Sequence, residues 1–361
     1  MAEIYRIGEY FSGPGGMAKG AHLAAGDVPN VEVRHAWAVD IDPDSCQTYT
    51  DNIPGASMET VKQSDVRGAL DRFELSAIDG FAFGFPCNDF SAVGRRKGLE
   101  GEFGPLYRSG IEVLQSKRPD WFVAENVGGI TSANQGRAFH QILAEMRDAG
   151  YTVVPHLYKF ERYGVPQRRH RIIVVGLRNE IADAGLTFRP PAPTHGPGTP
   201  NPLISAGAAL NRPYSADVTH RELTRQSARV IERLEYIGEG QNAFTAPIPP
   251  RLRLNVKGAT ISSIYRRLRE DEPAYTVTGS GGGGTHMYHW KQARALTNRE
   301  RARLQTFPDD FSFAGRRDSV RKQIGMAVPV TGARTVFAAL FKTLQGNEYQ
   351  SIESNLPAYM T

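Results

Sequence analysis

The sequence predicts an α/β fold with a doubly wound parallel sheet and a second, smaller domain. In the first half of the chain, short apolar runs alternate with amphipathic stretches, as they do where helices connect buried parallel strands. After Arg178 the chain becomes polar and basic, and the proline-rich run 189–200 cannot hold regular structure. We therefore expect a domain junction in that run.

The apolar runs are the predicted strands. They are residues 5–11, 33–39, 78–85, 121–124 and 172–175, and a further strand is expected to end near Asp65. Helices are predicted at residues 17–25, 106–117, 137–149, 297–306 and 319–344. The apolar faces of these helices are expected to form the core.

The composition limits the class of protein. The chain has 361 residues, 40% of them hydrophobic, so it can bury a large core. Two cysteines, Cys46 and Cys87, are too few for a disulfide framework or a cysteine-based zinc site, and we predict no metal. The N-terminal residues lack a signal peptide, and no later run approaches the roughly 20 apolar residues of a membrane span. We expect a soluble, cytoplasmic monomer.

The charge favours a polyanionic partner. The formal net charge is +5, and basic residues cluster at 95–97, 168–171, 266–269 and 316–322. Such clusters suit nucleic acid, although solvated helix faces look similar one at a time. Charge alone leaves both interpretations open.

A glycine-rich turn follows the first predicted strand. Gly13, Gly15 and Gly16 would let backbone amides approach a nucleotide-like ligand. The next strand ends at Asp40 and the third near Asp65, where carboxylates can accept hydrogen bonds from ribose. These residues indicate an adenosyl ligand. A nicotinamide oxidoreductase would explain the turn and Asp40, but only these.

Cys87 lies in Gly84-Phe85-Pro86-Cys87-Asn88, just after a predicted strand end. In an open α/β sheet, ligands and reacting groups collect at that edge. A thiol there can act as a nucleophile. The alternative is a small buried cysteine with no chemistry.

Taken in order, the motifs resemble those of the DNA cytosine-5 methyltransferases. The matching blocks are Phe-Ser-Gly-Pro-Gly-Gly from Phe11, Pro86-Cys87, Glu125-Asn126-Val127, Gln167-Arg168-Arg169-His170-Arg171 and residues 299–311. The resemblance implies a Rossmann-like doubly wound sheet, the S-adenosylmethionine-dependent methyltransferase fold. It assigns 1–178, completed by 291–345, to the catalytic domain, 179–290 to target recognition and 346–361 to a C-terminal tail.

The resemblance also implies roles for individual residues. Cys87 would add to carbon 6 of cytosine, and Glu125, Arg171 and Arg169 would hold the base. S-adenosylmethionine would be bound by Phe11, Gly13, Gly15, Gly16, Asp40, Ile41, Asp65, Val66, Pro86, Leu106, Met326 and Val328. Double-stranded DNA would contact a mobile loop with Ser91, Arg95, Arg96 and Lys97, and the recognition residues Arg221, Arg225, Arg251, Arg253, Arg266 and Arg267. The target cytosine would be flipped out of the duplex.

Three positions depart from the family pattern. Asn88 stands where glutamine is usual, Met326 replaces an asparagine, and Ile41 stands where an aromatic residue is frequent. Two other functions therefore stay open: a tRNA cytosine-5 methyltransferase, and a DNA-binding regulator with weak chemistry. The long stretch 179–290 favours duplex DNA over tRNA. The resemblance further suggests functional pairing with a restriction endonuclease in a bacterium or phage.

Overall fold

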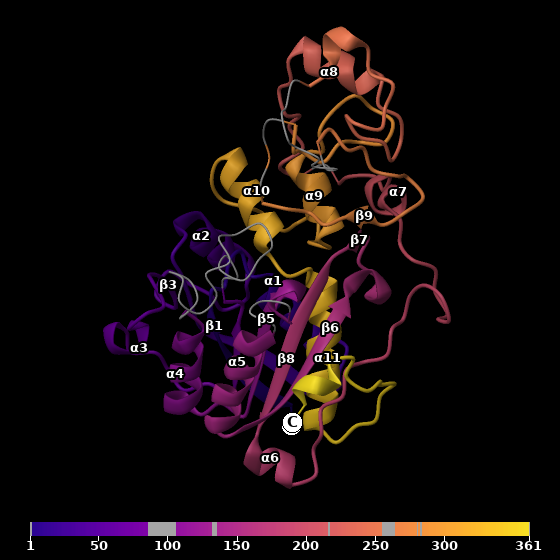
Figure 1. The fold of residues 1–361 in the computed structure, drawn as a ribbon. Coiled ribbons are helices and arrows are strands. Elements are labelled where there is room, and N and C mark those ends of the chain that lie inside the picture. The colour runs from indigo at the N-terminus through magenta and orange to yellow at the C-terminus, as the bar shows by residue number, and fades with distance from the viewer. Residues whose placement is uncertain are drawn as a thin grey trace. The chain divides into compact units, whose positions relative to one another are not determined.

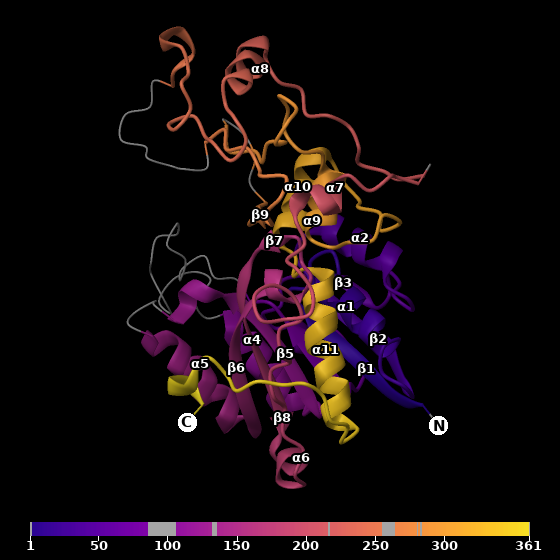
Figure 2. The same ribbon diagram turned by 90° about the vertical axis from the view of Figure 1, so that its right-hand side faces the viewer.

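The structure is a computed structural model that describes residues 2–85, 106–131, 136–215, 217–254, 264–279, 281 and 284–360. The chain forms two compact units (Figures 1 and 2). Unit 1 contains residues 1–159, 170–193 and 330–361, and unit 2 contains residues 160–169 and 194–329.

Unit 1 is built on a seven-stranded sheet (Figure 1). Its strands are β1 (Glu3–Tyr10), β2 (Val31–Asp40), β3 (Val61–Gln63), β4 (Gly80–Phe83), β5 (Trp121–Val127), β6 (Tyr151–Lys159) and β8 (His170–Arg178). Their order is β3-β2-β1-β4-β5-β8-β6. All pairs from β3 to β5 are parallel, whereas β8 runs antiparallel to both β5 and β6. The prediction of a wholly parallel sheet is therefore wrong at β8, and the α/β class is confirmed.

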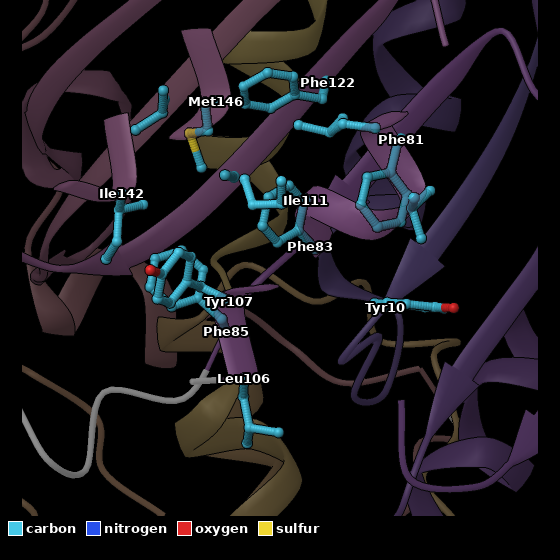
Figure 3. Packing of buried hydrophobic residues seen from close by; sticks show 14 of the residues in the cluster. Tyr10, Phe81, Phe83, Phe85, Leu106, Tyr107, Ile111, Phe122, Ile142 and Met146 are labelled. Atoms are coloured by element: carbon cyan, nitrogen blue, oxygen red, sulfur yellow. The ribbon is translucent and has the colours of Figure 1, made fainter. Parts of the chain in front are cut away.

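Helices cover both faces of this sheet, as expected for a doubly wound fold. Their bounds are α1 (Gly16–Ala25), α2 (Pro43–Asn52), α3 (Ala69–Arg72), α4 (Tyr107–Lys117), η3 (Gly128–Thr131), α5 (Arg137–Asp148), α6 (Asn179–Asp183), α11 (Val330–Leu344) and η7 (Pro357–Tyr359). On one face, Ile111 of α4 and Ile142 and Met146 of α5 pack against Phe83 and Phe122 (Figure 3). This cluster forms the larger core.

The opposite face of the sheet is covered by α1 and α11. The ring of Phe341 in α11 stacks on Tyr5 of β1 at 5.2 Å and meets Trp121 of β5 edge-on at 6.0 Å. The two helices approach closely, because a Cβ atom added at Gly20 would lie 2.4 Å from the Cβ of Ala333. The first and last long elements of unit 1 thus share one core.

The last predicted helix is divided into two helices in the structure, and its apolar part is mostly buried. Residues 319–344 were predicted as one helix, but the structure has α10 (Arg317–Met326) and α11, separated at residues 327–329, where Pro329 lacks the amide donor that a continuous helix needs. By length and hydropathy, Arg317–Leu344 meets the criterion for a membrane span, which the sequence analysis did not anticipate. Its apolar window is 72% buried in the structure, as in a core helix.

Unit 2 has little regular structure in its described part. It contains η5 (Phe160–Tyr163), β7 (Gln167–Arg168), α7 (Ala206–Leu210), α8 (Ala228–Glu235), η6 (Pro250–Leu252), β9 (Ala274–Tyr275), α9 (Asn298–Leu304) and α10. Its core gathers Leu234, Ile237, Leu252, Tyr265 and Tyr288. A capping box joins Thr297 and Glu300 at the start of α9.

The division into units differs from the predicted domain boundaries. The break at Pro193/Thr194 falls inside the proline-rich run 189–200. Residues 291–329, expected to complete the catalytic domain, pack with unit 2 instead. The tail 346–361 packs with unit 1, where Asn355 donates from Nδ2 to the Leu157 carbonyl and accepts from the Leu157 amide at the edge of β6.

Candidate active site

The carboxyl ends of the parallel strands of unit 1 carry the predicted glycine turn and Asp40. After β1, Phe11 has φ +53°, Gly13 φ +53° and Gly15 φ +93°, and α1 begins at Gly16. The Gly13 amide donates a 2.8 Å hydrogen bond to Asp40 Oδ2, and Asp40 Oδ1 accepts from the Asp42 amide at 2.9 Å. One carboxylate therefore ties the turn after β1 to the end of β2.

The space around this turn suits an adenosyl group. Apart from Gly13 and its two chain neighbours, no atom of the described residues lies within 4 Å of the place where a Cβ of Gly13 would be, so this part of the structure leaves the turn open there. Ile41, directly after Asp40, is 68% exposed, although large apolar side chains are normally covered. A flat apolar ring would cover it, so the residues present fit the predicted ligand.

The other predicted cofactor residues of unit 1 differ in accessibility. Asp65 forms hydrogen bonds with the Arg67 guanidinium and the Arg67 amide, and Arg67 holds the pKa of Asp65 below its usual value. Val66 and Leu106 are buried in the larger core. They can support a ligand pocket mainly by packing behind it.

Glu125 and Arg171 meet at the end of β5. Arg171 Nε lies 2.8 Å from Glu125 Oε1, and their side chains are 15% and 13% exposed. The antiparallel pairing of β5 with β8 produces this contact, because Arg171 is the register partner of Val127. A carboxylate and a guanidinium held together in a part-buried place can jointly bind a planar ring with donors and acceptors on its edge.

Asn126 links the end of β5 to the residues that directly follow β4. Its buried Nδ2 donates to the Phe85 carbonyl at 3.1 Å, while its Oδ1 accepts from the Val127 amide at 2.8 Å. A Cβ added at Gly84 would lie 3.3 Å from Glu125 Oε2, so the chain after β4 runs close to that carboxylate. Sequence reasoning gave Asn126 no role, although its place beside Glu125 in the quoted motif was a usable signal.

Several predicted residues lie outside the described part of the chain. They are Pro86, Cys87, Ser91, Arg95, Arg96 and Lys97. The second cysteine, Cys46, is buried on α2, where burial and the Asp40 charge raise the pKa of its thiol to about 12. Cys46 is therefore unsuited to act as a nucleophile.

Comparison with known proteins decides the family. Residues 5–342 match the family described as C-5 cytosine-specific DNA methylase. This chain belongs to that family. The methylase is 52% identical to the type II methyltransferase M.BbvI of Brevibacillus brevis, over 97% of this chain and 94% of that protein. It is 39% identical to the type II methyltransferase M.NgoFVII of Neisseria gonorrhoeae, over 96% of this chain and 89% of that protein.

Solved structures share the fold of the methylase. A putative DNA modification methyltransferase encoded within an E. coli prophage aligns with a TM-score of 0.71 and 20% identity, covering 94% of this chain and 99% of that one. The S. pombe Dnmt2 methyltransferase aligns with a TM-score of 0.59 and 15% identity, with the same coverage. The family uses S-adenosylmethionine, and its substrate is DNA.

In unit 2 of the methylase, Gln167 and Arg169 have structural contacts. Gln167 Nε2 donates to the Leu304 carbonyl and to Gln305 Oε1, and its Oε1 accepts from the Val277 amide. Arg169 is 1% exposed and donates from Nη1 to the Val277 carbonyl at 3.0 Å. These contacts give Arg169 a structural role in unit 2, and its predicted contact with the base stays a prediction, as it does for Arg171.

The remaining cofactor residues also lie in unit 2. Met326 is the last residue of α10 and is 64% exposed, whereas Val328 is buried. Exposure of Met326 is consistent with a surface that meets a ligand or another part of the protein. Val328 contributes packing.

The six recognition arginines fall into three groups. Arg221 and Arg225 are exposed, and Arg221 lies over the Tyr214 ring at 4.6 Å. Arg251 pairs with Glu232, and Arg253 donates to the Ile248 carbonyl at 3.2 Å. Arg266 and Arg267 line a pocket considered below. Among the described residues, no cluster of His, Cys, Asp or Glu could hold a metal ion.

Proposed function

We propose that this methylase modifies carbon 5 of a flipped-out cytosine in a short, specific sequence of duplex DNA, through a covalent adduct with Cys87. The observation that carries the proposal is the Glu125–Arg171 pair at the end of β5. It lies at the edge of the sheet that also carries the glycine turn and Asp40, and it can hold the polar edge of a cytosine.

The reaction begins with the Cys87 thiolate, whose electron pair forms a bond to carbon 6 of the ring. Negative charge then develops on the ring nitrogen and the carbonyl oxygen. The carboxyl form of Glu125 donates a proton to the ring nitrogen, and the carboxylate that remains accepts a hydrogen bond from the exocyclic amine, which stabilises that charge. Arg171 orients Glu125 through Nε and presents further N–H groups to the carbonyl oxygen.

The addition makes carbon 5 nucleophilic enough to take the methyl group that S-adenosylmethionine supplies when bound. A water molecule then removes the proton from carbon 5, and the electron pair of that C–H bond re-forms the ring double bond as the Cys87 thiolate leaves. The ring nitrogen returns its proton to Glu125, which restores the neutral product base. Asp40 and the open turn at Gly13 would hold the ribose side of the donor. Ile41 would pack on the adenine.

The names of the relatives support a restriction-modification role. M.BbvI and M.NgoFVII are both type II methyltransferases, and this chain aligns with nearly their full length. We infer that this methylase protects its host DNA against an endonuclease that cuts the same sequence. DNA from cells expressing it should resist that enzyme at the methylated motif.

The direct test measures transfer from labelled S-adenosylmethionine to mixed-sequence duplex DNA and to tRNA, followed by bisulfite mapping. Wild type should place methylcytosine in one DNA motif. Cys87→Ala should lose all transfer, whereas Cys46→Ala, the matched cysteine control, should retain it. Transfer to tRNA alone, or transfer to DNA that survives Cys87→Ala, would overturn the proposal.

A further inference from the structure

A solvent-open pocket in unit 2 gathers four guanidinium groups. It is lined by Arg168, Gly240, Arg266, Arg267, Leu268, Arg269, Glu272, Pro273 and Tyr275. The short parallel pairing of β7 with β9 places Arg168 beside Tyr275, and residues 266–269 form another wall. Four of the nine described lining residues are arginines and one, Glu272, is acidic, so the lining has an excess of positive charge.

Arg267 forms no ion pair with the described residues that line this pocket, although the charge of Glu235 acts on it. It is 7% exposed and donates from Nη1 to the Trp290 carbonyl at 3.1 Å, and its buried Nε has no hydrogen-bond partner among the described residues. Burial lowers the pKa of Arg267 from its ordinary value. A buried cation with an unused donor is costly, and an anion entering the pocket would reduce that cost.

Glu272 serves as an exchangeable counterion. Its carboxylate lies 2.8 Å from Arg168 Nη2 and 3.5 Å from Arg269 Nε. The side chains of Arg168, Arg269 and Glu272 are 48%, 54% and 38% exposed. Ion pairs that open to solvent contribute little stability, so a stronger anion can replace the carboxylate without unfolding the wall.

Two further contacts orient the side chains of Arg266 and Arg269. The Arg266 guanidinium lies over the Tyr275 ring at 4.9 Å, which fixes its plane. Gly240 has φ +72°, and a Cβ there would lie 2.7 Å from Arg269 Nε. Glycine at 240 therefore lets Arg269 lie directly against the backbone.

We propose that this pocket binds a phosphodiester group of the DNA backbone. The proposal rests on the proposed function, since it names how the same DNA is held. Guanidinium groups match phosphate oxygens through paired N–H donors, and a phosphate is reached without opening a base pair. Arg168, Arg266 and Arg269 are thereby assigned to holding the duplex in register, with no part in reading its sequence.

The test measures binding of the full-length chain to two duplexes over a series of salt concentrations. One duplex contains the motif that the enzyme modifies, as found by bisulfite mapping, and the other lacks it. Arg168→Ala and Arg269→Ala should each weaken binding by about tenfold on both duplexes. The slope of log affinity against log salt should fall by about 0.9 for each lost contact. Glu272→Gln should strengthen binding to both.

Arg118→Ala is the matched control, because Arg118 is also an exposed arginine paired with a glutamate, Glu180, at 3.0 Å in unit 1. It should leave the affinity and the salt slope unchanged. Arg168→Lys, which keeps the charge and loses the paired donors, should fall between wild type and Arg168→Ala. Thermal unfolding of each variant shows that the loss is not a folding defect.

A loss confined to the motif duplex, or a changed motif preference, would assign the pocket to base reading and overturn the proposal. The proposal would also be overturned if Arg168→Ala and Arg269→Ala bound both duplexes as tightly as Arg118→Ala does. If wild type methylates no DNA, the proposed function fails. The salt slopes of the binding curves still show whether the pocket binds backbone phosphate.

Discussion

Arg171→Met should reduce the stability of unit 1 more than Glu125→Gln does, whereas Glu125→Gln should mainly reduce kcat. Arg171 Nε donates to Glu125 Oε1 at 2.8 Å, with both side chains less than one-sixth exposed (15% and 13%). A hydrogen bond between charged groups contributes about 1.5–3 kcal/mol in such a place. Arg171→Met leaves the carboxylate without that donor, so we expect a loss of about 2 kcal/mol, or about 4–8 °C in the melting temperature of a unit this size.

Glu125→Gln keeps an oxygen facing Arg171 and removes only the charge. We therefore expect a smaller loss of about 1 kcal/mol, or about 2–4 °C. An amide cannot supply the proton that the ring nitrogen takes up, so kcat should fall by about 10²–10³. Binding of S-adenosylmethionine should change little in either variant.

The assay combines thermal unfolding, cofactor titration and single-turnover methyl transfer for both variants and the double mutant. Trapping on duplex DNA that carries 5-fluorocytosine at the target holds the Cys87 adduct after methyl transfer, because fluorine at carbon 5 cannot leave as a proton does, and so reports addition and transfer together. The reasoning is refuted if Glu125→Gln unfolds as early as Arg171→Met while its kcat falls less than tenfold. Glu125 would then be a structural carboxylate.

Three other groups give independent predictions. Glu9 is fully buried beside the Tyr49 hydroxyl, and burial raises its pKa to about 8, so its contribution to stability is complete below about pH 4.5 and is lost as the pH rises through 8. Glu9→Gln should therefore raise the melting temperature at pH 8.5 and leave it nearly unchanged at pH 5; an equal shift at both pH values would contradict this. Arg301 is 1% exposed, and none of its side-chain nitrogens has a hydrogen-bond partner among the described residues. Arg301→Met should raise the melting temperature of unit 2, because it removes an unpaired buried charge, and a decrease in calorimetry would show a partner for that charge. Tyr359 packs on Phe139 and His140 and donates from Oη to the Thr131 carbonyl at 3.3 Å. Tyr359→Ala should cost about 3 kcal/mol and increase hydrogen exchange in η3, with Tyr359→Phe costing about 1 kcal/mol; equal costs for the two variants would exclude a packing role.

The strands were predictable where both sides are buried. β1, β2, β4, β5 and β8 each coincide with a predicted apolar run, because each contains three or more consecutive buried residues, as strands covered on both faces do. β6 was missed, since Pro155 and His156 interrupt its apolar pattern. Proline is tolerated there because β6 lies at the edge of the sheet. Apolar content carries no information on direction, so the reversal of β8 was not predictable.

The site was predictable in part, for a related reason. Glycines and acids at strand ends identify the edge of the sheet, and the structure joins Gly13 to Asp40 and Glu125 to Arg171 there. Arg169 and Arg171 have the same chemistry and are two residues apart, yet one is buried among unit 2 residues and the other lies in unit 1. Only the packing of residues distant in sequence, such as Val277, gives the two arginines different surroundings.

The shared core of α1 and α11 has a consequence for synthesis of the protein. On the ribosome, Tyr5 and Trp121 emerge long before Phe341, the ring that finally covers them. The nascent chain must therefore carry an uncovered aromatic face while all of unit 2 is translated. A message cut short before residue 330 would yield a product with an incomplete core, suited to capture by chaperones and to proteolysis.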